Sequence, residues 1–168
     1  MVNPMSFKIR PASDQDREWV GSLLRDRWGS CMIVSRGKVY DASRLPAFVA
    51  ICENELLGLI TYRFDSAQCE IVTLDSLKEG YGIGSALIEA VTRAAVNAGC
   101  ARLWLITTND NTPALRFYEE RGFAIKAVYP NALENSRRLK PEIPEIGIDG
   151  VPIRDEIELE YRFDTTPR

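Results

Sequence analysis

A glycine-rich segment, residues 79–85 (EGYGIGS), precedes the most regular amphipathic helix that the sequence predicts. Because glycine carries no Cβ, the backbone amides around Gly80, Gly82 and Gly84 could approach a ligand closely. The first amides of a helix have no partner within it and lie at the positive end of its dipole. The segment could therefore hold a pyrophosphate on backbone amides without a lysine. The glycines are also compatible with a tight turn that only leads into the helix.

Two better-known phosphate loops do not match this segment. A Walker A loop needs the string G-x-x-x-x-G-K-[ST], which the sequence lacks. A dinucleotide fingerprint needs G-x-G-x-x-G, but Leu87 stands where the third glycine would follow Gly82 and Gly84.

The chain of 168 residues contains no histidine. Ser-His-Asp and Cys-His catalysis and imidazole metal ligation are therefore excluded. None of the four cysteines forms a C-x-x-C pair, so we expect free thiols and no metal site. Acid–base chemistry must use carboxylates, tyrosine, cysteine, lysine or water.

A second motif, residues 111–118 (NTPALRFY), is followed by Gly122 and Phe123. With the glycine segment upstream, it resembles the GNAT superfamily of N-acetyltransferases. Their first motif is Q/R-x-x-G-x-G/A, and their second is N-x-x-A-x-x-F/L-Y followed by G-F. The matching positions are Gly82, Gly84, Asn111, Ala114, Phe117, Tyr118, Gly122 and Phe123. The resemblance is strong from about residue 46 to 129 and weaker outside that range.

The resemblance implies acetyl-CoA as cosubstrate, bound where two neighbouring strands separate. It assigns the pyrophosphate to the amides of residues 81–85 and the pantetheine arm to the backbone of residues 74–76. The implied cofactor-binding residues are Leu74, Asp75, Ser76, Tyr81, Gly82, Ile83, Gly84, Ser85, Asn111, Ala114 and Tyr118. The family role of Tyr118 is to protonate the departing CoA thiolate, which a phenol can do. Tyr118 could instead be a core residue, and Asn111 a simple helix N-cap.

The sequence departs from the family pattern at Glu79, where glutamine or arginine is usual. A carboxylate close to a pyrophosphate would repel it. We therefore expect Glu79 to point away, or Lys78 to compensate for it, or the affinity for the cofactor to be reduced.

Glu70 is the first candidate for the base that deprotonates an amine acceptor. Period-2 spacing predicts that it shares a strand face with Val72 and Leu74, an apolar setting that would raise its pKa. Asp75, predicted to face the opposite side, is the second candidate, and a water chain is the third. Glu70 could also be an exposed or structurally paired carboxylate.

Apolar periodicity and turn residues predict a mixed α/β fold. The predicted strands cover 7–10, 47–52, 56–64, 68–74, 101–107, 123–129 and 156–163. A first helix is predicted to begin after an N-cap at residue 13 or 14, and further helices are predicted over 82–98, 112–120 and 132–139. Short turns between the strands over 47–74 predict an antiparallel meander. The secondary structure of residues 30–45 is ambiguous. In the last strand, apolar and charged residues alternate, which predicts one solvated face. By resemblance, the sheet is mostly antiparallel, with helices on both faces and a splayed central strand pair.

One domain is predicted over residues 7–164, with flexible tails at 1–6 and 165–168. A net charge of −3 argues against nucleic acid or an anionic membrane as partners. No stretch approaches the ~18 apolar residues of a membrane span, and no signal sequence is recognisable, so we expect a cytoplasmic protein.

The segment 131–155 is long for a loop, and we expect it to line an acceptor site or a homodimer contact. Its basic residues Arg137, Arg138 and Lys140 could favour an anionic acceptor or could simply be solvated. The sequence thus predicts direct transfer of an acetyl group from acetyl-CoA, in a ternary complex, to a small-molecule or peptide amine. The alternatives are a non-catalytic acyl-CoA-binding module, and transfer of another acyl group or to an oxygen acceptor.

Overall fold

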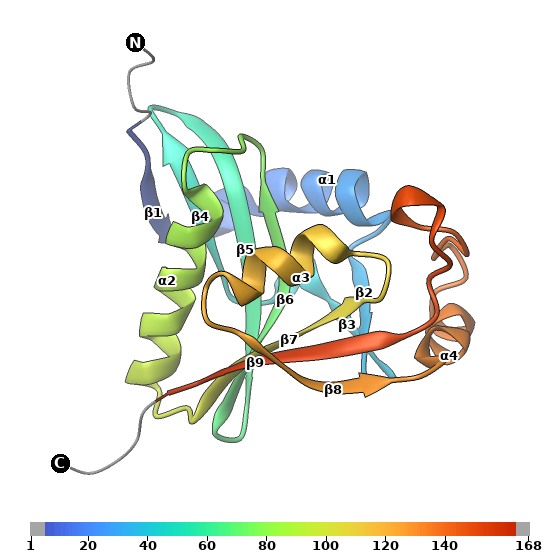
Figure 1. Ribbon diagram of the computed structural model, residues 1–168. Coiled ribbons are helices and arrows are strands. Elements are labelled where there is room, and N and C mark those ends of the chain that lie inside the picture. The colour runs from blue at the N-terminus through green and yellow to red at the C-terminus, as the bar shows by residue number, and fades with distance from the viewer. Residues whose placement is uncertain (1–5, 164–168) are drawn as a thin grey trace, which may run out of the picture.

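The computed structural model describes residues 6–163, and within them seven strands form one sheet in the order β1-β4-β5-β6-β7-β9-β8 (Figure 1). Its strands are β1 (Lys8–Pro11), β4 (Ala47–Cys52), β5 (Glu55–Asp65), β6 (Gln68–Ser76), β7 (Arg102–Thr108), β8 (Ala124–Tyr129) and β9 (Glu156–Arg162). Only the β6–β7 pair is parallel among these strands. The mostly antiparallel α/β fold is therefore confirmed. Apart from Ser6, the tails predicted to be flexible lie outside the described residues.

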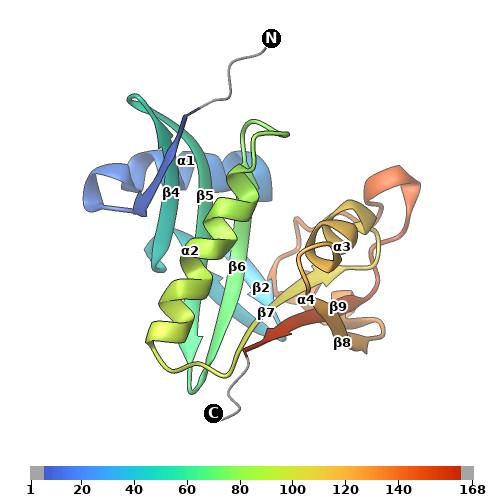
Figure 2. The ribbon, with the colours of Figure 1, turned by 60° about the vertical axis from the view of Figure 1, so that its left-hand side comes forward.

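Helices cover both faces of this sheet, as predicted (Figures 1 and 2). They are α1 (Arg17–Trp28), α2 (Ile83–Asn97), α3 (Thr112–Glu119) and α4 (Ala132–Leu139). The apolar stripe of α2 packs on one face with Ile60 and Ile71, and α3 adds Tyr118 to the same core. On the other face α1 packs through Leu24 against Leu59. The sheet therefore separates two apolar cores.

The ambiguous residues 30–45 form a separate antiparallel hairpin of β2 (Met32–Ser35) and β3 (Lys38–Asp41). Its turn places Arg36 and Gly37 at φ of +48° and +76°, left-handed values that suit a tight turn. The predicted turn at Arg36–Lys38 is confirmed, and β2 contacts α4 on the α1 side of the sheet.

A β-bulge in β6 reverses the side-chain alternation that period-2 spacing predicts. Ile71 pairs with Tyr62, but Thr73 pairs with the next residue of β5, Thr61, so Val72 is the extra residue. Beyond the bulge, Leu74 packs in the α2 core, while Asp75 accepts a hydrogen bond from Trp28 of α1. The predictions that Glu70 shares a face with Leu74 and that Asp75 faces away from Glu70 are therefore wrong.

The central strands β6 and β7 pair only between Gln68–Ile71 and Arg102–Leu105. Both strands continue, to Ser76 and Thr108, without pairing to each other, so they separate (Figure 2). The predicted splayed central pair is confirmed, and the backbone groups of β6 that point into the gap have no neighbouring strand there.

The charged face of β9 is buried over its first half, which contradicts the predicted solvated face there, while Arg162 at its end is exposed. Glu156 and Glu158 are only 3% and 6% exposed. Glu156 pairs with Arg36 of the hairpin turn at 2.9 Å, and Glu158 pairs with Arg102 of β7 at 2.7 Å. Alternation distinguishes two faces, but it does not show that a neighbouring element covers the charged one with matching guanidinium groups.

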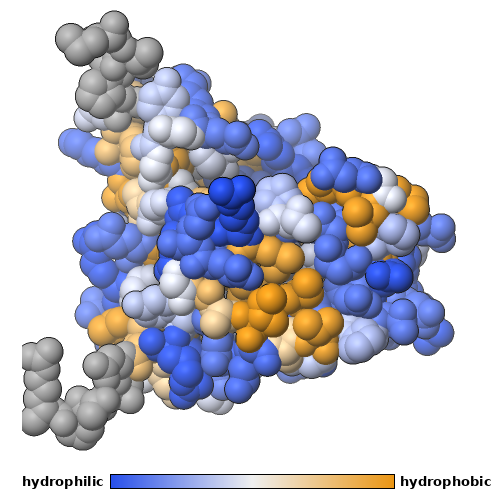
Figure 3. Space-filling model, viewed as in Figure 1, coloured by the Kyte–Doolittle hydropathy of each residue, from blue (hydrophilic) through white to orange (hydrophobic). Residues whose placement is uncertain are grey.

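The edge strand beside β9, which is β8, carries exposed apolar side chains, including Ile125 and Val128. Figure 3 shows an apolar area beside α3 on this face of the molecule. An uncovered edge strand is a surface that can pair with another chain. The predicted homodimer remains a prediction.

Candidate active site

A cleft of about 590 Å³ opens on the α2–α3 side of the separated strands. It brings together eight of the residues that the sequence assigns to cofactor binding: Leu74, Ser76, Gly82, Ile83, Gly84, Ser85, Ala114 and Tyr118. The three others are placed differently. Asp75 lies on the α1 face, Tyr81 is exposed, and Asn111 caps α3 by accepting a hydrogen bond from the amide of Ala114 at 3.2 Å.

The glycine segment has the geometry of an anion site made of backbone. Gly82 is the N-cap of α2 at φ +79°, a left-handed conformation that side chains rarely adopt. The first helical hydrogen bond runs from the amide of Ala86 to the carbonyl of Gly82, so the amides of residues 83–85 precede it. A Cβ on Gly84 would lie 3.0 Å from the Phe117 ring, so this glycine allows α2 and α3 to approach closely.

Two cations line the same cleft, Lys78 and Arg121. Arg121 donates from Nε to the Ser85 hydroxyl at 2.8 Å and from Nη1 to the Phe117 carbonyl at 2.7 Å. Its guanidinium also lies 3.5 Å from the centre of the Phe117 ring, a cation–π contact. Sequence reasoning missed Arg121, because the family motif leaves that position unspecified and only the α2–α3 contact reveals it.

Glu79 also lines this cleft and is exposed. Lys78 and Arg121 line the same cleft, and the expected compensation of the Glu79 charge by Lys78 remains a prediction.

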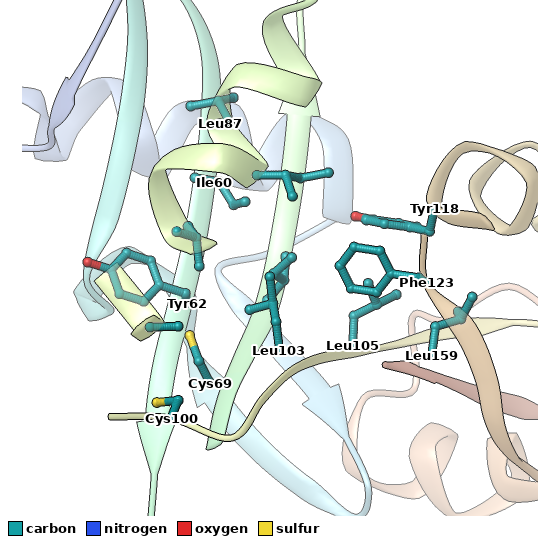
Figure 4. Packing of buried hydrophobic residues seen from close by; sticks show 14 of the residues in the cluster. Ile60, Tyr62, Cys69, Leu87, Cys100, Leu103, Leu105, Tyr118, Phe123 and Leu159 are labelled. Carbon is teal, nitrogen blue, oxygen red and sulfur yellow. The ribbon is translucent and has the colours of Figure 1, made fainter. Parts of the chain in front are cut away.

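Tyr118 projects from α3 across the gap between the strands. Its ring is 7% exposed and packs edge-on against Phe117 and Phe123, with centroids 5.1 and 5.4 Å away. Figure 4 shows its hydroxyl pointing toward β6. Burial raises the pKa of Tyr118, so the phenol keeps its proton at neutral pH. It is therefore a core residue whose protonated hydroxyl lies at the cleft.

A second cleft, of about 570 Å³, lies on the opposite side of the sheet. It is bounded by the end of α1, by β2 and α4, and by β6, β7 and β9. Glu70 lines it at 2% exposure and accepts hydrogen bonds from the Ser35 hydroxyl and from Arg63 Nε, both at 2.7 Å. Burial raises the pKa of Glu70, and these two partners oppose that rise. Glu70 is thus structurally paired and also faces a cleft.

The segment 131–155 forms one wall of this second cleft through α4 and the residues after it, including Leu133, Ile143 and Ile153. Its basic residues do not form an anion site. Arg137 donates to the carbonyls of Ile143, Pro144 and Ile153, and Arg138 is exposed. Lys140, the only one of the three that lines the cleft, is buried and donates to the Trp28 carbonyl at 2.8 Å.

The two clefts approach the separated strands from opposite faces. Leu74 and Ser76 of β6 line the first, and Glu70 and Val72 of the same strand line the second. A thioester bound from one side and a nucleophile bound from the other could therefore meet in the gap. The phenol of Tyr118 lines the first cleft and the carboxylate of Glu70 lines the second, so the sheet carries a possible acid and a possible base on opposite faces, as acyl transfer could use.

Within residues 6–163, no three or more acidic or cysteine side chains are grouped so that they could hold a metal ion. The same part of the chain has no helix with the length and apolar character needed to cross a membrane.

Comparison with known proteins connects this geometry to one family. Residues 14–123 match the family model described as the acetyltransferase (GNAT) family. The uncharacterized protein YdhI of Bacillus subtilis is 43% identical over 150 residues, which are 89% of this chain and 94% of that protein.

Solved structures show the same fold at low sequence identity. A Bacillus subtilis acetyltransferase in complex with CoA has a TM-score of 0.70 at 18% identity, covering 94% of this chain and 99% of that one. The ribosomal-protein-S18-alanine N-acetyltransferase of Escherichia coli has a TM-score of 0.68 at 15% identity, covering 97% of each chain.

Proposed function

The chain belongs to the acetyltransferase (GNAT) family, and from this premise we propose that it transfers the acetyl group of acetyl-CoA directly to an amine. One observation carries the proposal: the two clefts lie on opposite faces of the sheet, and β6 lines both of them beside the point where it separates from β7. A ternary complex needs separate access for two substrates to one reaction centre, and this arrangement provides it.

Acetyl-CoA would occupy the cleft beside α2 and α3. The amides of residues 83–85 and the side chains of Lys78 and Arg121 would hold its phosphates. The backbone of β6 beyond Ile71, which has no strand partner in the gap, would pair with the pantetheine arm as an added strand does. The CoA-bound Bacillus subtilis relative supports this choice of cosubstrate.

The amine would approach through the cleft that Glu70 lines. Its nitrogen attacks the thioester carbonyl, a C–N bond forms, and the C–S bond breaks. Glu70 takes the proton that the nitrogen loses, and Tyr118 gives its proton to the departing sulfur. Backbone amides of β6 near Leu74 stabilise the negative charge that develops on the carbonyl oxygen.

Initial-rate kinetics and product analysis test this function together. Acetyl-CoA and a panel of primary amines and alcohols are varied, released CoA is measured, and products are identified by mass spectrometry. Intersecting double-reciprocal plots and N-acetylated products are expected. Parallel plots would indicate a covalent acetyl-enzyme, and products acetylated only on oxygen would contradict the choice of an amine.

A second candidate function is a non-catalytic acyl-CoA-binding module. It is favoured by the ion pair between Glu70 and Arg63, because a carboxylate held by a guanidinium is a weaker base. Tight binding of acetyl-CoA in a calorimetric titration, without CoA release above the hydrolytic background for any acceptor, would support this alternative.

A further inference from the structure

We propose that the acceptor is a small primary amine with an apolar body and no carboxylate group, bound in the cleft beside Glu70 and Glu156. This inference rests on the proposed function and specifies its substrate class. It replaces the anionic acceptor that the basic residues of segment 131–155 could have favoured.

Buried carboxylates define the polar side of this cleft. Glu70, Glu156 and Asp110 all line it and are 2%, 3% and 5% exposed. Glu70 and Glu156 each have an arginine partner. Asp110 accepts hydrogen bonds from the Thr108 hydroxyl at 2.5 Å and the Ile148 amide at 3.1 Å, and no cation of residues 6–163 forms an ion pair with it. The donors that hold its carboxylate are therefore neutral groups.

The surrounding ion-pair network is also negative. Its carboxylates are Asp65, Glu70, Glu156, Glu158 and Glu160, and its guanidinium partners are those of Arg36, Arg63, Arg102 and Arg162. Five negative and four positive charges leave a net charge of −1. The other charged lining residues, Asp110, Glu142, Arg27 and Lys140, add two negative and two positive charges, so the net charge stays −1. At low local dielectric such a balance attracts an ammonium group and repels a carboxylate.

The cations that line the cleft are not placed to receive a substrate carboxylate. Lys140 is buried and donates to the Trp28 carbonyl, and burial lowers its pKa. Arg27 lies at the end of α1, with a half-exposed side chain 3.9 Å from Asp26. A guanidinium in that position is largely screened by solvent.

Most of the remaining lining is apolar and comes from several elements, including Ile33, Val72, Ile106, Leu133 and Ile153, while Ser35, Thr108, Ser136 and Glu142 add polar groups. Sites for small molecules typically have volumes of about 300–1,000 Å³, are mostly apolar and carry a few placed polar groups. A cavity of about 570 Å³ with this lining fits an amine that has a compact apolar body.

Binding measurements test the inference independently of turnover. The full-length protein is saturated with CoA, and 2-phenylethylamine and 3-phenylpropanoate are titrated calorimetrically as matched probes of opposite charge. We expect the amine to bind at least tenfold more tightly than the carboxylate. Equal or tighter binding of the carboxylate, or binding of neither probe, would overturn the inference.

Turnover separates the inference from the proposed function. With acetyl-CoA, kcat/KM is measured for 2-phenylethylamine, phenylalanine amide and phenylalanine. We expect phenylalanine to be at least tenfold poorer than its amide, because only phenylalanine carries a carboxylate. Equal rates for the two would overturn the inference and leave the function standing. No turnover of any amine, with binding of 2-phenylethylamine intact, would contradict the function alone.

A matched pair of variants tests whether this cleft causes the preference for phenylalanine amide over phenylalanine. Glu156→Gln should narrow the preference for the amide over phenylalanine at least threefold, because Glu156 lines the cleft. Glu158→Gln removes the same charge from a similarly buried, ion-paired carboxylate on the same face of β9 outside the lining, and should narrow the preference less than Glu156→Gln does. If Glu156→Gln does not fold, Asp110→Asn replaces it. An equal effect of both β9 variants would overturn the assignment to this cleft.

Discussion

Glu70 is held by two opposing effects on one carboxyl group. Its burial disfavours the charged form, while Ser35 and Arg63 stabilise it through hydrogen bonds. The net result is a raised pKa, which brings the group closer to neutral pH than an ordinary glutamate. A carboxylate with a raised pKa is a stronger base than an ordinary glutamate, so it takes a proton from the acceptor amine more readily.

The first prediction concerns Glu70→Gln. A base works only when it is deprotonated, so kcat/KM of the wild type should fall as the pH falls through the raised pKa of Glu70. Glu70→Gln should lower kcat/KM by about 10²–10⁴-fold and remove this acidic limb. The measurement is kcat/KM against pH, with acetyl-CoA binding as the control for folding. An unchanged limb in the variant would assign the base to another group or to water.

The second prediction concerns Tyr118→Phe. The ring contacts with Phe117 and Phe123 remain in this variant, but the proton donor is lost. We expect kcat to fall by about 10²-fold or more, with little change in the Kd for acetyl-CoA. Tyr62→Phe removes a hydroxyl from the same core, away from the cleft, and serves as the control. Unaltered turnover of Tyr118→Phe, with chemistry rate-limiting, would remove Tyr118 from the mechanism.

At the scale of single residues, sequence motifs identify site residues whose neighbours in the site are also close to them in the sequence. Gly82, Gly84 and Tyr118, which the motifs identify, line one cleft, and their contacts with a cofactor remain a prediction. Arg121 and Glu156 were not assigned to the site, because their roles depend on partners 36 and 120 residues away, Ser85 and Arg36. No local spacing encodes such contacts.

At the scale of elements, the sequence predicted most strands and helices, including α4 and the hairpin turn. It did not predict the bulge at Val72, because an extra residue in one strand leaves the apolar pattern almost unchanged. That single residue decides which side chains of β6 face each cleft. It places Leu74 on the α2 side and Asp75 on the α1 side.

The third prediction tests how closely α2 must approach the sheet. A Cβ on Gly58 of β5 would lie 2.7 Å from Cγ2 of Ile83 and 3.2 Å from the carbonyl oxygen of Asp75. Gly58→Ala should therefore lower the free energy of unfolding by about 1–3 kcal/mol. It should also weaken acetyl-CoA binding, because Ile83 begins the helix whose amides face the cofactor cleft. Denaturant unfolding and calorimetry measure the two effects.

Gly21→Ala is the matched control for that variant. Its Cβ would meet only the end of the flexible Arg25 side chain, at 3.1 Å, in the interior of α1. Alanine favours helix by about 1 kcal/mol over glycine, so no loss of stability is expected. If both variants lose stability equally, close packing at Gly58 is not the cause.

At the scale of the whole molecule, acetyl-CoA would connect two parts of one sheet. The strands β1, β4, β5 and β6 lie on one side of the gap, and β7, β9 and β8 on the other. A parallel ladder of four residue pairs joins them. Cleft residues come from both sides, from β6 and α2 on one and from α3 on the other.

The fourth prediction follows from this bridging. Acetyl-CoA at one hundred times its Kd should raise the free energy of unfolding by about 2.7 kcal/mol and the Tm by about 5–10 °C. The Tm should rise with acetyl-CoA concentration in differential scanning calorimetry. Acetate at equal concentration, which lacks nucleotide and pantetheine, is the control. A Tm that does not change over the series would contradict cofactor binding in this cleft.

The short ladder between β6 and β7 also has a consequence for hydrogen–deuterium exchange. Successive backbone amides of a strand point to opposite edges, so alternate amides of β6 after Ile71 face the gap rather than β5. These amides should exchange quickly with deuterium, while those bonded to β5 in the same strand exchange slowly. When acetyl-CoA is added, its pantetheine arm should slow the exchange of these alternate amides, so an exchange map of this one strand would show where the arm binds.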